Sequence, residues 1–136
     1  MPLVITVGPH AFRARWEERA PRTREAIRKL LPFESRLIQA RWSGESAWVP
    51  MGDRVVVMDP ENATSHPSPG ELLLYTGTLS ETEILFPYGA TSFASKMGRL
   101  AGNHFATIVE GGEQLGDLGR RVLYEGAQQI RIEERD

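Results

Sequence analysis

The chain has 136 residues, of which 40% are hydrophobic and 25% charged, so it can bury a core and is expected to form one domain, residues 1–136. Its 16 basic and 18 acidic side chains leave a formal net charge of −2, which argues against a dedicated nucleic-acid-binding protein. The absence of cysteine excludes disulfides, thiolate metal sites and cysteine nucleophiles, and the lack of a long apolar run predicts a cytoplasmic protein with no membrane partner.

The N-terminal segment has the pattern of a β-hairpin followed by a helix. Two β-forming runs, Leu3–Val7 and residues 11–16, flank a Gly-Pro turn. Apolar and basic residues alternate in the second run, which predicts one buried and one solvent-exposed face. Pro21 favours a first helical turn, and an apolar stripe after it predicts a helix over residues 21–30.

The next segment predicts an antiparallel strand pair. Residues 34–42 and 46–49 have strand character and are separated by a turn-like Ser-Gly-Glu. This pairing would bring Trp48 close to Trp42. A further short strand is expected over the β-branched residues 54–58.

A long polar segment follows at residues 59–70. It contains Pro60, Pro67 and Pro69 among serine, threonine and asparagine residues. A loop of this length in a compact domain is usually either functional or disordered, and the sequence leaves both alternatives open.

Short apolar runs alternate with glycine-rich segments in the C-terminal half. Residues 71–75, 83–86 and 104–109 are predicted to be buried strands. Periodicity does not decide the form of residues 88–103. Apolar residues at helical spacing predict a final helix over residues 113–129, which three internal glycines weaken.

These elements predict a mainly β protein. Seven or eight short strands with short connections are typical of a small closed β-barrel, here of about eight strands with two flanking α-helices. A parallel α/β sheet would require more crossover helices than this pattern contains.

Three histidines are available for metal binding or acid–base catalysis: His10, His66 and His104. Their spacing matches neither a cupin-type histidine pair nor a His-Glu-x-x-His helix, so no metal site and no cofactor are predicted. His104 opens a predicted buried strand, where it is either a structurally hydrogen-bonded histidine or a general base.

Glu81 and Glu83 form the candidate carboxylate pair. If the segment is extended, the two side chains lie on one face about 7 Å apart. That arrangement suits paired acid–base roles or a hard cation. The alternative is that both are solvated or paired with arginine.

Two tryptophans with charged neighbours form the best candidate site. Its residues are Arg41, Trp42, Glu45 and Trp48. Their side chains would provide an aromatic wall with charged orienting groups, as in small-ligand pockets. The alternative is that the indoles are core residues. Further candidates for the rim of such a pocket are Tyr75, Tyr88 and Lys96.

Several segments are distinctive in their order along the chain. They are Glu18-Arg19-Ala20-Pro21-Arg22-Thr23, Leu31-Pro32-Phe33-Glu34-Ser35-Arg36, Ala40-Arg41-Trp42-Ser43-Gly44-Glu45, Ser80-Glu81-Thr82-Glu83-Ile84-Leu85-Phe86-Pro87-Tyr88-Gly89 and Gly102-Asn103-His104-Phe105. Together they resemble an uncharacterised prokaryotic family of cyclophilin-like proteins, and the resemblance covers nearly the whole chain. It implies a closed barrel of about eight strands with a helix at each end.

The resemblance does not extend to the prolyl isomerase machinery. Cyclophilins carry a Phe-His-Arg segment and a Gln-Gly-Gly-Asp segment soon after the first helix, where this chain has residues 36–42 followed by Ser43-Gly44-Glu45. The cyclophilin catalytic arginine therefore cannot be carried over to a residue of this chain, and fold alone does not imply function.

Three hypotheses for function follow. The first is a protein that binds a small molecule in a pocket at the barrel, as a metabolic enzyme or accessory subunit acting on a cyclic amide-type compound. That substrate class is an analogy, because some cyclophilin-like barrels belong to amide- and lactam-hydrolysing systems. The second hypothesis is a peptidyl-prolyl isomerase or proline-peptide binder. The third is a structural protein that assembles as a homo-oligomer, so whether the protein is an enzyme stays open.

Overall fold

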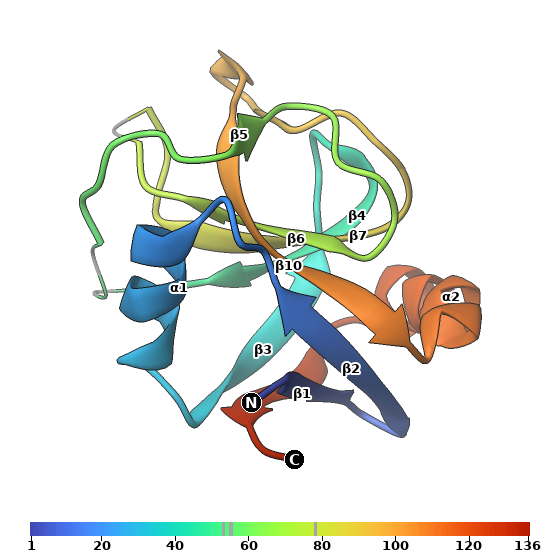
Figure 1. Ribbon diagram of the computed structural model, residues 1–136. Coiled ribbons are helices and arrows are strands. Elements are labelled where there is room, and N and C mark those ends of the chain that lie inside the picture. The colour runs from blue at the N-terminus through green and yellow to red at the C-terminus, as the bar shows by residue number, and fades with distance from the viewer. Residues whose placement is uncertain (53, 55, 78) are drawn as a thin grey trace.

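The computed structural model describes residues 1–52, 54, 56–77 and 79–136. In these residues eight antiparallel strands form a barrel in the order β2-β1-β11-β3-β4-β7-β6-β10, and pairing of β10 with β2 closes it (Figure 1). Their bounds are β1 Leu3–Val7, β2 His10–Trp16, β3 Phe33–Gln39, β4 Gly44–Pro50, β6 Glu71–Tyr75, β7 Glu83–Thr91, β10 Gly102–Glu110 and β11 Gln128–Glu134. The predicted mainly β fold with a closed barrel of about eight strands and two helices is confirmed.

The remaining elements lie outside the barrel. The short strand β5, Ala63–Thr64, pairs with β10, and β8, Ala94–Ser95, forms a separate hairpin with β9, Gly98–Arg99. The helices are α1, Pro21–Arg28, and α2, Leu115–Glu125, which a 3-10 turn at Gly112–Gln114 precedes. The two α-helices lie on opposite sides of the barrel in the view of Figure 1.

The barrel interior holds the main apolar core. In β2 the alternation predicted from the sequence is observed, since Phe12, Ala14 and Trp16 are buried and the arginines between them face outward. Ile5 of β1 and Ile132 of β11 are opposed in register and fully or almost fully buried, so neighbouring strands contribute to the same core.

Strands β6 and β7 are buried on both faces. Leu72 and Leu74 face the barrel core, whereas Leu73 belongs to a second apolar cluster outside the barrel. This second cluster consists of Leu73, Tyr75, Leu85, Phe93 and Leu100, with Trp48 packed against it. Burial on both faces explains why these strands appear in the sequence as continuous apolar runs instead of alternating ones.

Two predicted elements are wrong. The strand expected over residues 54–58 is not formed: Arg54 and residues 56–58 have no strand structure, and Val57 is 85% exposed, while residue 55 lies outside the described residues. The helix expected over residues 113–129 ends at Glu125. Gly126 has a φ of +95°, which terminates the helix.

Strand β11 was not predicted from the sequence, because the helical pattern extends into its first residues. After Gly126 the chain becomes the strand Gln128–Glu134, in which Ile130 and Ile132 are buried. It pairs with β1 on one side and β3 on the other, so it is a central strand of the barrel. Two isoleucines spaced two residues apart were too short a signal to outweigh the helical periodicity before them.

The segment of residues 59–70 is held by hydrogen bonds to several elements. Glu61 N donates to Asn103 Oδ1 over 3.0 Å, and Asn62 Nδ2 donates to the carbonyl of His104 over 2.9 Å. Gly70 N donates to the carbonyl of Pro87 over 2.9 Å. The segment is therefore an ordered layer over the barrel, with β5 inside it.

Candidate functional site

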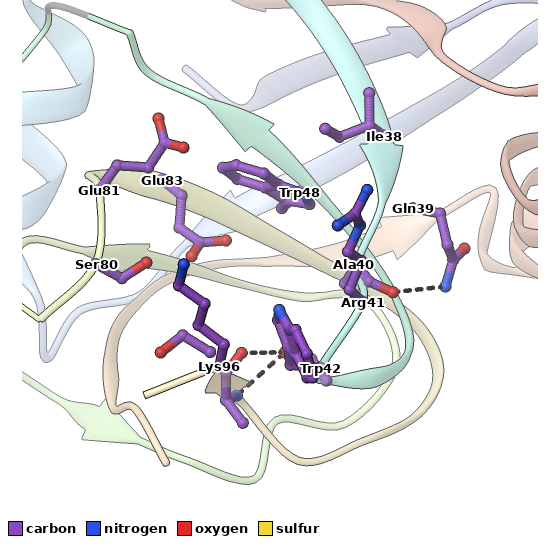
Figure 2. Close-up of a pocket in the computed structure, with 13 residues that line it drawn as sticks. Ile38, Gln39, Ala40, Arg41, Trp42, Trp48, Ser80, Glu81, Glu83 and Lys96 are labelled. Atoms are coloured by element: carbon purple, nitrogen blue, oxygen red, sulfur yellow. Dashed lines mark hydrogen bonds between the residues drawn. The ribbon is translucent and has the colours of Figure 1, made fainter. Parts of the chain in front are cut away.

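A pocket of about 350 Å³ lies on the outer face of the barrel, beside the second apolar cluster. Its walls are the end of β3 with residues 40–43, Trp48 of β4, the segment before β7 and the β8–β9 hairpin (Figure 2). The volume is at the small end of the range for ligand pockets. We call it the Trp42–Trp48 pocket.

The turn that carries Arg41 and Trp42 is fixed by Ser43. The Ser43 Oγ atom accepts a hydrogen bond from Ala94 N and donates one to Ala94 O, each over 3.1 Å. Gly44 then adopts a φ of +87°, and a side chain there would collide with the carbonyl of Ala90. Strand β3 ends at Gln39, earlier than the sequence predicted. The hydrogen bonds between Ser43 and Ala94 join two walls of the pocket, the turn and the β8–β9 hairpin.

The two indoles lie on opposite sides of the pocket (Figure 2). Trp48 is half-buried because it packs against the second apolar cluster. Trp42 is 56% exposed, so it is not a core residue. The third tryptophan, Trp16, is buried elsewhere and its Nε1 donates to the carbonyl of Met1 over 3.1 Å.

Glu83 places a carboxyl group at the buried end of the pocket. Only 7% of the residue is exposed, and among the described residues its carboxyl group has no hydrogen-bond or ion-pair partner. Burial, and then repulsion by the charge of Glu81, raise the pKa of Glu83 to about 8. Near pH 7 the group is therefore mainly protonated, and it can donate a hydrogen bond to a ligand rather than carrying charge.

Two cations line the same pocket. Arg41 and Lys96 are both exposed, and neither pairs with a carboxylate in the part of the chain that the structure describes. In Figure 2, Glu83 and Lys96 lie toward one end of the space and Arg41 toward the other. The pocket thus combines two aromatic walls with hydrogen-bond donors at both ends.

Comparison with protein families identifies one family model that covers almost the entire chain. It is described as a protein of unknown function (DUF3830), and it matches residues 3–134. The chain belongs to the DUF3830 family. A comparison with curated proteins gave no match.

The solved structures that resemble this DUF3830 chain include McbB and an archaeal hypothetical protein. The structure of McbB in complex with tryptophan aligns with a TM-score of 0.74 and 19% identity, over 98% of this chain and 44% of that chain. The solution structure of the hypothetical protein AF2241 from Archaeoglobus fulgidus aligns with a TM-score of 0.66 and 22% identity, over 99% of this chain and 95% of that chain. The chain therefore spans less than half the length of McbB, and at these identities the likeness concerns the fold.

The structure of the DUF3830 chain brings together six of the residues singled out from the sequence. They are Arg41, Trp42, Trp48, Glu81, Glu83 and Lys96. The sequence pattern did not reveal Ser43, Ser80 or Ser95, which also line the pocket. Serine in a turn gives no signal that distinguishes a pocket residue from an ordinary loop residue.

Three other predicted residues lie outside the pocket. Glu45 Oε1 accepts a hydrogen bond from Ala90 N over 2.9 Å, which joins the turn to β7. Tyr75 is part of the second apolar cluster, and its hydroxyl accepts from Leu79 N over 3.2 Å. Tyr88 donates to the Gln39 Oε1 atom over 2.8 Å, so it reaches the pocket only through that glutamine.

His104 also lies away from the pocket, in a hydrogen-bonded chain. Thr107 Oγ1 donates to Glu17 Oε2 over 2.7 Å, so it accepts the 2.8 Å hydrogen bond from His104 Nε2. The imidazole therefore carries a proton on Nε2. His104 is therefore the donor and the Thr107 hydroxyl the acceptor of this hydrogen bond. The histidine does not take the proton of the threonine hydroxyl.

Metal-binding clusters and membrane-spanning helices are both missing from the described residues. Within them, no group of three or more histidine, aspartate or glutamate side chains is placed to hold a metal ion. In the same residues no helix has the length and apolar character needed to cross a bilayer.

Proposed function

We propose that this protein binds a small planar molecule in the Trp42–Trp48 pocket, with Glu83 as the central polar contact. The observation that carries the proposal is the carboxyl group of Glu83, which is buried at the pocket and unpartnered among the described residues. Burying an unpaired polar group costs free energy, so such groups are concentrated at functional sites. A ligand oxygen would complete the missing hydrogen bond.

The indoles support a planar ligand. Trp42 and Trp48 offer aromatic faces from two sides, and stacking of this kind stabilises flat ring systems. McbB, which shares the fold, was solved in complex with tryptophan, and that complex is a property of McbB. For the present chain it is a reason to include tryptophan among the ligands tested.

The finer hypotheses remain proposals. A protonated Glu83 suits the carbonyl of a cyclic amide-type compound, as expected for a metabolic enzyme or accessory subunit acting on such a compound. The relation to cyclophilins, a prokaryotic source, a single domain and a cytoplasmic location also stay predictions. The alternatives of a prolyl isomerase or proline-peptide binder and of a homo-oligomeric assembly protein stay predictions as well.

The experiment uses the fluorescence of the two pocket tryptophans. A set of one- and two-ring planar compounds is titrated into the protein while emission is followed, and tryptophan, which itself fluoresces in the same range, is titrated by calorimetry. We expect saturable quenching, with weaker ligand affinity in Glu83→Ala. Loss of the quenched signal in Trp42→Phe and Trp48→Phe would show that the quenching comes from the pocket. Glu18→Ala is the control, because Glu18 is an exposed carboxylate outside the pocket.

Two results would overturn the proposal. One is that no compound of the set binds at concentrations up to the millimolar range. The other is that ligands bind equally well to the parent, Glu83→Ala and Glu18→Ala proteins, because binding would then occur elsewhere.

A further inference from the structure

We propose that the ligand of the Trp42–Trp48 pocket is a planar ring carboxylate, whose carboxylate group pairs with Arg41 and whose neutral ring oxygen accepts a hydrogen bond from Glu83. This inference rests on the proposed function and adds the chemical class of the ligand. It follows from the distribution of charge, burial and hydrogen-bond donors around the pocket.

The first argument is charge. The charged side chains lining the pocket are Arg41 and Lys96, both positive, and Glu81, which is negative, because Glu83 is mainly neutral near pH 7. The lining therefore carries a net charge of about +1 on a chain whose net charge is −2. A positive cavity on a negative protein favours an anionic ligand over a cationic one.

The second argument is the difference in burial between the two ends. Arg41 is exposed, whereas Glu83 lies at the buried end. An ionised ligand group loses less hydration at the exposed end, and a neutral oxygen is less costly to bury than a charge. The carboxylate is therefore assigned to the Arg41 end and the neutral acceptor to the Glu83 end.

The third argument is the excess of donors. The Arg41 guanidinium offers a planar fork of donors that matches a carboxylate. The protonated carboxyl of Glu83 offers one donor, and the ammonium of Lys96 lies toward the same end in Figure 2. A ligand rich in acceptor oxygens satisfies these groups, whereas an amine or a hydrocarbon does not.

The strand neighbours of Glu83 are uncharged, and the positive group nearest this end of the pocket in Figure 2 is the exposed ammonium of Lys96. The register partners of Glu83 are Tyr75 on β6 and Pro50 on β4, neither of which brings a positive charge. The charged groups of the pocket are Glu81 on the preceding segment, Lys96 on the hairpin and Arg41 on the turn.

The test uses three matched two-ring probes. They are 2-oxo-1,2-dihydroquinoline-4-carboxylate, its uncharged 4-carboxamide, and naphthalene-1-carboxylate, which has no hydrogen-bond acceptor in the ring. Dissociation constants are measured at pH 7 by tryptophan quenching and by calorimetry. The proteins are the parent, Arg41→Gln, Glu83→Ala and the control Arg36→Gln, which changes an exposed arginine of β3 outside the pocket.

We expect the oxo-carboxylate to bind about tenfold more tightly than its carboxamide, as one charge-assisted contact would give. Arg41→Gln should remove this preference and leave carboxamide binding unchanged. Glu83→Ala should weaken both probes that carry the ring carbonyl but not naphthalene-1-carboxylate. Arg36→Gln should behave as the parent.

Other outcomes separate the two proposals. Equal affinity of acid and carboxamide, or equal weakening of both by Arg41→Gln, would overturn the ligand class while leaving a planar-ligand pocket in place. If none of the three probes binds but neutral planar compounds do, the ligand class again fails. If no planar compound binds at all, the proposed function itself fails.

Discussion

Glu61, which is partly buried, and Glu83, which is buried, are two acidic residues with opposite surroundings. The Glu61 side chain is 8% exposed and its carboxylate accepts hydrogen bonds from the backbone and side chains of both Arg22 and Thr23. Glu83 is 7% exposed and has no such partner among the described residues. At Glu83, burial raises the pKa. At Glu61 burial acts in the same direction, but the hydrogen bonds from Thr23 and Arg22 outweigh it, so the pKa of Glu61 is lowered.

The difference separates a residue that serves the fold from one that is available to a ligand. The N-cap of α1 is Ala20, whose methyl side chain cannot accept a hydrogen bond from the free N–H groups of the first turn. Glu61 fills that role from a distant loop and thereby holds residues 59–62 against the helix. Among the described residues, Glu83 makes no comparable hydrogen bonds. We therefore infer that its carboxyl group is available to bind a ligand.

The largest expected effect is on the pH dependence of stability through Glu83. Its folded-state pKa of about 8 lies above the usual value of 4.5, so the folded state binds the proton more tightly than the unfolded state. The parent should therefore lose about 3 to 4 kcal/mol relative to Glu83→Gln as pH rises from 5 to 8, since about 1.4 kcal/mol corresponds to one unit of pKa difference.

Urea unfolding of both proteins across this pH range measures that loss. Near pH 4 the two proteins should be equally stable, because the carboxyl is protonated in both the folded and the unfolded parent. A constant difference between them at all pH values would contradict the assignment of a raised pKa to Glu83.

The second effect is a loss of stability when Glu61 is replaced. Glu61→Ala should destabilise the protein by about 2 kcal/mol at pH 7, because buried Thr23 and the first turn of α1 lose their acceptor. The loss should shrink as pH falls through the lowered folded-state pKa of Glu61, since the parent then loses the same contacts. Denaturant unfolding measures it, with Glu18→Ala as the unaffected control.

The third effect concerns binding. If the protonated carboxyl of Glu83 donates to the ring oxygen, affinity for the oxo-carboxylate probe should fall about tenfold per pH unit above the pKa of about 8. Glu83→Gln keeps a neutral donor and should show no such fall. Calorimetry between pH 6 and 9.5 tests this, and parallel pH profiles for the two proteins would count against it.

The smallest expected change in stability is at Trp42. Because this indole is 56% exposed, Trp42→Ala should alter the free energy of unfolding by less than about 0.5 kcal/mol. The same variant should nevertheless lose ligand binding, since one wall of the pocket is removed. A large loss of stability would place Trp42 with Glu61, among the residues that serve the fold.

The sequence predicted most of the barrel because strand patterns are local. The β1–β2 hairpin and the apolar runs of β6 and β7 follow from turn chemistry and β-forming residues. Strand β11 was missed because a helical periodicity continued up to Gly126, and only pairing with two distant strands makes Gln128–Glu134 extended.

The candidate site was predicted in part for a similar reason. Trp48 and Glu83 come together because the neighbouring antiparallel strands β4 and β7 carry them, and Trp42 joins them from the turn between β3 and β4. The direction of Tyr88, by contrast, is set by α2 and Gln39, which are remote in sequence. The partners of Glu61 on α1 also have no local signal, so its structural role becomes visible only in three dimensions.

The most direct test of the account is the pKa of Glu83 itself, with and without ligand. It can be followed through the carboxyl carbon by NMR titration, with Glu83→Gln to assign the signal. We expect a pKa of about 8 in the free protein and a higher value when the oxo-carboxylate probe is bound, because that ligand favours the protonated form. An ordinary pKa near 4.5, or a value that saturating ligand leaves unchanged, would contradict the account.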